Sequence, residues 1–148
     1  MRSADSLSHT EIEAITYEWE RALAAHDVDA LLACYAPDAT LESPLIPHVL
    51  GTEGVCRGHE QLRSFLTEVL RRTPVARHYH RGAFFTDGRQ VIFEYPRSGP
   101  DGEQMDFVEV MEIEHGVIRA HRVYWGWRGV GILANDQYYR DNRPDIDR

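Results

Sequence analysis

The stretch WERALAAHDVDALLACYAPDATLESP, residues 19–44, changes its secondary-structure pattern twice. Its first part continues a helical spacing of apolar residues as far as Asp27, which can cap a second, short helix over residues 28–36. Pro37 ends that helix, because the residue before a proline is pushed towards extended conformations. DATLES, residues 38–43, then reads as a short strand. The stretch therefore predicts a fold in which helices lead directly into the first strand of a sheet.

Two further helices flank this stretch. Residues 8–26 form the first, with Ser8 and Glu11 spaced as a capping box at its start. Residues 43–58 hold two prolines and three glycines and predict a long loop. Residues 59–73 repeat apolar side chains at helical spacing and predict a third helix.

Further along the chain the apolar period changes to two, which is typical of strands. Four strands are expected, over residues 75–85, 90–97, 104–114 and 117–127. Their connections are short and rich in glycine and aspartate, so consecutive strands should be antiparallel. The sequence predicts one α+β domain over residues 1–148, a curved antiparallel sheet on three N-terminal helices, with residues 1–7 and 141–148 as flexible ends.

Composition narrows the class of protein. The chain is 43% hydrophobic and 27% charged, as in globular proteins, and its net charge is −8. An acidic protein repels phosphates, so we expect neither a nucleic acid nor a membrane as partner. No apolar run reaches the roughly 20 residues of a membrane span, and the N-terminus lacks the apolar region of a signal peptide. Cys34 and Cys56 are isolated, which favours reduced thiols and a cytoplasmic location.

The order of these elements resembles the SnoaL-like and ketosteroid isomerase-like branches of the nuclear transport factor 2-like superfamily. The resemblance rests on residues 19–44, on CRGHEQLRSFL at 56–66 and on GVIRAHRVYWG at 116–126. It implies a cone-shaped α+β barrel with a deep, mostly apolar cavity at its open end. Members of this superfamily include isomerases, polyketide cyclases, dehydratases, epoxide hydrolases and binders without catalysis, and dimers through the outer sheet face are common. The fold alone therefore does not name a reaction.

Alignment with the family's motifs shows where this chain departs from known sites. Ser43 stands where isomerase-like members keep the aspartate that shuttles a proton, and a serine needs its own base for that chemistry. Trp19 stands where that branch has a tyrosine, and it offers only an indole N–H. His78 matches the histidine of dehydratase-like members, but the aspartate paired with it there falls near Ala24, unless Asp27 takes its place. Steroid isomerisation of the known kind is not expected.

The last hairpin supplies a different acid/base pair. Reading EHG as a three-residue turn places Glu109 directly across from His121, Phe107 across from Val123 and Met105 across from Trp125. Burial in an apolar pocket disfavours the ionised form of a carboxyl group, while a nearby protonated imidazole favours it. Such opposed effects are how acid/base pairs are built. By motif, Glu109 also stands where isomerase-like members keep a protonated acid for the oxyanion hole.

A two-residue turn gives a different result. It shifts the register by one, so that Val110 faces His121 while Glu109 forms a surface ion pair with Arg122. On the other sheet face, Arg122 and Tyr124 would serve the outer surface or a dimer contact. The sequence leaves both registers open.

Other candidates surround this pair. His78 and His80 have a spacing that can chelate a metal, but without a third ligand we expect no metal. His48, in the long loop, would lie near the mouth of the cone, where it could replace the base missing at Ser43 or, as we rather expect, simply be exposed. The substrate-binding wall is expected to comprise Trp19, Tyr35, Ser43, His48, Phe65, Phe107 and Trp125.

These residues suggest a small-molecule enzyme that needs no cofactor. Glu109 and His121, with His78, would perform acid/base chemistry on a hydrophobic substrate: isomerisation, cyclisation, dehydration or epoxide opening. The alternative is a non-catalytic module that binds a small hydrophobic ligand, and an adaptor for another protein is a third hypothesis. In each case we expect a homodimer through the outer sheet face.

Overall fold

The structure, a computed structural model, describes residues 6–72, 83–94, 97–98 and 104–134. Its helices are α1 (His9–Ala24), α2 (Val28–Ala33), α3 (Leu45–Leu50), α4 (Gly58–Arg72) and α5 (Trp127–Ala134). Its strands are β1 (Tyr35–Glu42), β2 (Val55–Arg57), β3 (Phe84–Thr86), β4 (Gln90–Glu94), β5 (Arg97–Ser98), β6 (Gln104–Met105), β7 (Phe107–Glu114) and β8 (Val117–Trp125). The fold is α+β, as the sequence predicts.

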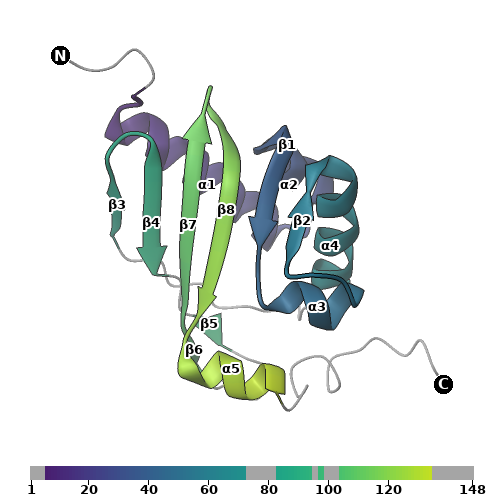
Figure 1. Cartoon of the computed structure of the whole chain (residues 1–148). Helices are drawn as coiled ribbons and strands as arrows, with labels where there is room; N and C mark the ends of the chain where they lie inside the picture. The colour runs from purple at the N-terminus through teal and green to yellow at the C-terminus, as the bar shows by residue number, and fades with distance from the viewer. Residues whose placement is uncertain (1–5, 73–82, 95–96, 99–103, 135–148) are drawn as a thin grey trace.

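The main sheet of the described residues has six strands in the order β2-β1-β8-β7-β4-β3 (Figure 1). The pairs β3–β4, β4–β7 and β7–β8 are antiparallel, as expected for the four predicted strands. The expectation of a wholly antiparallel sheet is wrong, because β1 pairs with β8 in parallel. Strand pairing over such a sequence distance depends on tertiary packing, which no local pattern records. The sheet is mixed and does not close into a barrel.

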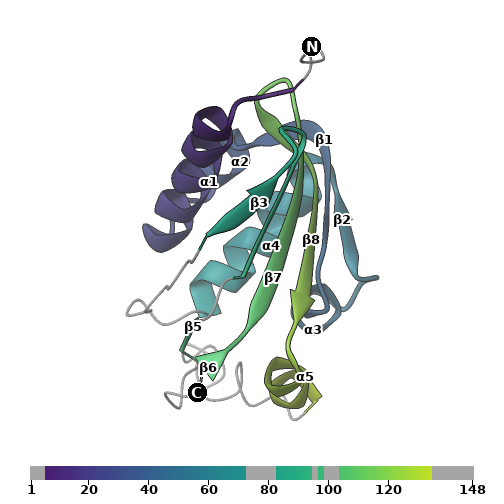
Figure 2. The same cartoon turned by 90° about the vertical axis from the view of Figure 1, so that its left-hand side faces the viewer.

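Helices α1, α2 and α4 cover one face of this sheet (Figures 1 and 2). The alternation of β4 places Val91 and Phe93 in the core while Ile92 faces outward. Helix α1 contributes Ile12 and Trp19 at helical spacing to the same core. The core and the inner face of the sheet are therefore one surface.

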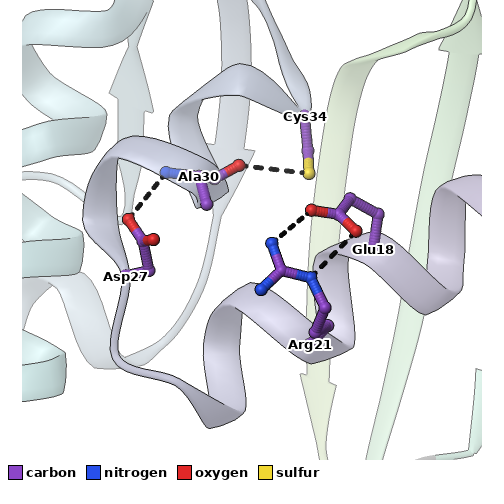
Figure 3. A network of polar contacts seen from close by, with 5 residues as sticks. All are labelled: Glu18, Arg21, Asp27, Ala30 and Cys34. Carbon is purple, nitrogen blue, oxygen red and sulfur yellow. Dashed lines mark hydrogen bonds and ion pairs between the residues drawn. The ribbon is translucent and has the colours of Figure 1, made fainter.

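Short-range signals fix the starts of the first two helices. The Ser8 side chain accepts the N–H of Glu11, whose carboxylate accepts the N–H of Ser8 in return, so the predicted capping box is confirmed. Asp27 caps α2 by accepting the N–H of Ala30 at 2.9 Å (Figure 3). Helix α2 ends at Ala33, earlier than predicted, because the following residues already belong to β1.

Two expectations about irregular segments are wrong. The predicted loop over 43–58 contains helix α3 and strand β2, which pairs with β1. No helix was expected after residue 127, but residues 127–134 form α5, whose Leu133 is buried. Helices α3 and α5 follow β1 and β8, and both lie at the same end of the sheet (Figure 1).

The outer face of the sheet carries exposed apolar side chains. Phe85, Ile92 and Tyr124 are 74%, 40% and 55% exposed. Among the described residues, no helix combines the length and apolar character needed to cross a membrane.

Candidate active site

Four buried polar side chains form one continuous chain of hydrogen bonds through the core. The indole Nε1 of Trp19 donates to the Tyr35 hydroxyl at 3.0 Å. That hydroxyl lies 2.8 Å from Nδ1 of His121. Nε2 of His121 lies 2.5 Å from a carboxylate oxygen of Glu109. Each of the four residues is at most 5% exposed, so water screens these contacts little.

The β7–β8 hairpin brings Glu109 and His121 to the same face. Its turn has two residues, His115 and Gly116, both with positive φ (51° and 79°), as a type I′ turn requires. A β-bulge then inserts Arg119 into β8, because Glu112 pairs with Ala120 while the next residue, Ile113, pairs with Ile118.

The predicted register is therefore wrong by two residues. Met111, not Glu109, stands opposite His121, while Glu109 stands opposite Val123 and Phe107 opposite Trp125. An error of two keeps each side chain on its face, since strand side chains alternate with period two. Glu109 reaches His121 as a diagonal neighbour, a distance that a long side chain spans.

The two-residue turn of the alternative prediction is confirmed, but the bulge shifts the register by one more residue, so the surface position that it gave Glu109 is wrong. Arg122 lies on the outer face and pairs with Glu112 at 2.9 Å. Arg119 is exposed and pairs with Glu114 at 3.3 Å. Ile118, the residue before the bulge, is fully buried on the inner face.

Tyr35 enters the site from the first residue of β1. Parallel pairing sets it beside Ile118, and its ring stacks on the His121 imidazole with centroids 6.0 Å apart. The Trp19 ring meets the same imidazole edge to face at 5.5 Å. Two aromatic rings thus hold the imidazole plane while hydrogen bonds hold its two nitrogens.

Burial strongly raises the pKa of the Tyr35 hydroxyl. The hydrogen bond from Trp19 opposes this effect, and the nearby Glu109 charge adds to it. Tyr35 therefore remains a protonated phenol across the physiological range and can act as a hydrogen-bond donor, not as a phenolate base.

A cavity of about 80 Å³ opens against this chain of residues. Its walls come from the helices and from the inner sheet face, and include every substrate-binding candidate of the described residues except His48. Its lining comprises Trp19, Leu23, Tyr35, Leu41, Ser43, Leu45, Phe65, Leu66, Val69, Phe107, Glu109, His121, Val123 and Trp125.

The remaining predicted site residues are His48 and His78. His48 is exposed on α3 and does not line the cavity, because the segment expected to be a loop is helical there. His78, with His80, lies outside the described residues. Ser43 lines the cavity, but its hydroxyl accepts the N–H of Leu45 at 3.2 Å at the entry to α3.

A larger, open depression of about 610 Å³ lies around the turn of the β7–β8 hairpin, where Arg89, Glu114 and Arg119 line it. None of the four hydrogen-bonded residues reaches it. We place the site in the smaller cavity because that is where buried polar groups converge on a concave wall.

The sequence model of the family described as the SnoaL-like domain matches residues 17–121, well over half of the chain. The chain belongs to the SnoaL-like family. No curated protein matches its sequence.

Solved structures share the SnoaL-like fold. A SnoaL-like protein of unknown function from Burkholderia thailandensis is 25% identical with a TM-score of 0.70, over 82% of this chain and 98% of that one. SalBIII, an epoxide hydrolase/cyclase-like enzyme of pyran ring formation in the polyether salinomycin, is 21% identical with a TM-score of 0.63, over 82% of this chain and 95% of SalBIII. TerC, co-crystallised with polyporic acid, is 18% identical with a TM-score of 0.67, over 88% of this chain and 98% of TerC.

Proposed function

We propose that this SnoaL-like domain is an enzyme that performs acid/base chemistry, without a cofactor, on a small hydrophobic molecule bound in the cavity. One observation carries the proposal: a buried carboxylate, Glu109, is bound to a buried imidazole, His121, on the wall of the cavity. Buried ionisable pairs are costly to a fold and concentrate at functional sites.

Glu109 is the candidate base. A carboxylate can remove a proton from a substrate carbon or from a water molecule: a C–H or O–H bond breaks, the proton moves to the carboxylate oxygen, and the electron pair stays on the substrate or on the attacking hydroxide. The His121 imidazole stabilises and orients the carboxylate. The proton can then return to another atom of the substrate, as isomerisation and ring closure require.

The remaining wall suits an apolar substrate. Phe65, Phe107 and Trp125 offer aromatic surface, and Trp125 lies edge to face on Phe107 with centroids 4.7 Å apart. The cavity is smaller than the roughly 300–1,000 Å³ of ordinary small-molecule sites, so a cyclic substrate requires its side chains to move apart. The epoxide hydrolase/cyclase-like description of SalBIII is consistent with this chemistry.

Turnover of a substrate panel by matched variants tests this proposal. Neutral cyclic ketones, β-diketones and epoxides are incubated with the protein in D₂O, and NMR records C–H exchange, double-bond shifts and diol formation. Glu109→Gln should reduce the rate of any reaction found by roughly 10²–10⁴-fold, the usual contribution of a general base. His121→Ala should also reduce it strongly.

Glu112→Gln is the matched control, since the same substitution on the same strand breaks only the outer-face pair with Arg122. It should leave the rate unchanged. A reaction that survives both Glu109→Gln and His121→Ala would refute the assignment.

A non-catalytic binding module is the second candidate. The presence of Ser43, whose hydroxyl is engaged by the Leu45 N–H, in place of the family's proton-shuttling aspartate favours it. This function predicts saturable binding of apolar ligands by calorimetry, with affinity unaffected by Glu109→Gln and no turnover of any panel member.

A further inference from the structure

Trp19 stands at one end of the chain of hydrogen bonds, and its side chain can only donate a hydrogen bond. An indole N–H donates and never accepts, whereas a phenol hydroxyl does both and a neutral imidazole has one nitrogen of each kind. Trp19 therefore makes the Tyr35 oxygen an acceptor at the 3.0 Å contact. The direction of the other two hydrogen bonds follows from where the Tyr35 hydrogen points.

One assignment satisfies every hydrogen along the chain. The Tyr35 hydroxyl donates to Nδ1 of His121, which leaves Nδ1 as an acceptor and puts the imidazole hydrogen on Nε2. Nε2–H then donates to a carboxyl oxygen of Glu109. The raised pKa of Tyr35 agrees with a phenol that keeps its proton for donation.

The reverse assignment leaves a hydrogen without a partner. With Nδ1 protonated, the Tyr35 oxygen accepts from both Trp19 and His121. Its own hydrogen then has no acceptor among the residues that the structure describes. Buried hydroxyl groups are rarely left in that state, since burial without a partner costs free energy.

We propose that Trp19 is a positioning residue whose N–H occupies one lone pair of the Tyr35 oxygen, favours donation of the Tyr35 hydrogen to Nδ1, holds His121 in the Nε2–H tautomer and so directs Nε2–H at Glu109 on the cavity wall. This inference rests on the proposed role of Glu109 as the base. It assigns the Trp19 indole N–H to the orientation of Tyr35, while the Trp19 ring forms part of the cavity wall. Tyr35 likewise acts through His121 and not on the reacting atoms.

The tautomer of His121 can be measured directly in the wild-type protein. Long-range ¹H–¹⁵N correlation NMR distinguishes protonated from unprotonated ring nitrogens, and His121→Asn identifies the signals that belong to this residue. We expect a protonated Nε2 and an unprotonated Nδ1. A protonated Nδ1, alone or together with Nε2, would overturn the proposal without any variant having to fold.

Trp19→Phe tests whether the indole sets this state. It keeps an aromatic ring against His121 and removes only the N–H donor. Loss of one hydrogen bond should shift the tautomer ratio by about two- to tenfold towards protonated Nδ1. Trp127→Phe is the matched control, because Trp127 is 82% exposed and lies outside the cavity.

The failures of this proposal and of the proposed function are distinguishable. An unchanged tautomer in folded Trp19→Phe would show that the indole does not set the direction. Glu109→Gln could instead leave turnover intact while wild type shows the Nε2–H tautomer and Trp19→Phe shifts it. That result would support the positioning role of Trp19 and refute the role of Glu109 as the base.

Discussion

Replacing Tyr35 by Phe removes a single oxygen atom from the centre of the hydrogen-bond chain. Two buried partners lose a hydrogen-bond partner at once: the Trp19 N–H at 3.0 Å and Nδ1 of His121 at 2.8 Å. The loss of a hydrogen-bond partner by a buried group costs about 1–3 kcal/mol, so losing both contacts should lower the free energy of unfolding by roughly 2–6 kcal/mol. Tyr35 itself is only 2% exposed, so water does not replace the lost contacts.

Urea unfolding followed by circular dichroism measures this change. Tyr17→Phe is the matched control on α1, since Tyr17 is 63% exposed, and it should change stability by less than about 0.5 kcal/mol. The double variant Trp19→Phe/Tyr35→Phe should lose less than the sum of the single losses, because each single change already removes the hydrogen bond between these two residues. A loss below about 0.5 kcal/mol for Tyr35→Phe, or strict additivity of the pair, would refute a cooperative buried chain.

Three further predictions follow from the described residues. Because burial raises the pKa of Tyr35, the folded protein keeps the Tyr35 proton above about pH 10, where the unfolded chain releases it. The stability contributed by Tyr35 is therefore complete below about pH 10. Above that pH, the free energy of unfolding of wild type should fall by about 1.4 kcal/mol per pH unit relative to Tyr35→Phe, as urea unfolding at alkaline pH measures. Burial also raises the pKa of the Cys34 thiol to about 11 and raises that of Cys56. Iodoacetamide at pH 8, followed by mass spectrometry, should therefore label neither thiol until the protein unfolds, and rapid labelling of the folded protein would contradict their burial. If two copies pair through the outer sheet face, light scattering should give twice the 17.0 kDa chain mass, and Ile92→Arg with Tyr124→Glu should restore the single-chain mass; a wild-type monomer would end that proposal.

Local chemistry explains what the sequence predicted well. Ser8 and Asp27 cap helices through contacts with residues three positions away, which a sequence displays directly. The shared inner face of Glu109 and His121 was predictable because strand alternation survives a register error of two.

Non-local and strained features explain what the sequence did not predict. The sequence left the two-residue turn open as one of two alternatives, because His115 at φ 51° stands where glycine or asparagine is the usual signal, and the bulge at Arg119 has no sequence signature. The contact between Tyr35 and His121 joins residues 86 positions apart through parallel pairing with β8. Helix α3 has only six residues and contains Pro47, so its formation depends on packing of Leu45 and Ile46 rather than on propensity.

The most direct test of the account is a crystal structure of the protein with the tightest-binding member of the substrate panel. We expect the ligand to occupy the cavity beside Trp19 and Trp125, with its reacting atom within about 2.6–3.2 Å of the Glu109 carboxyl group. A ligand bound instead in the depression around Arg89 and Arg119, with Glu109 and His121 untouched, would contradict it.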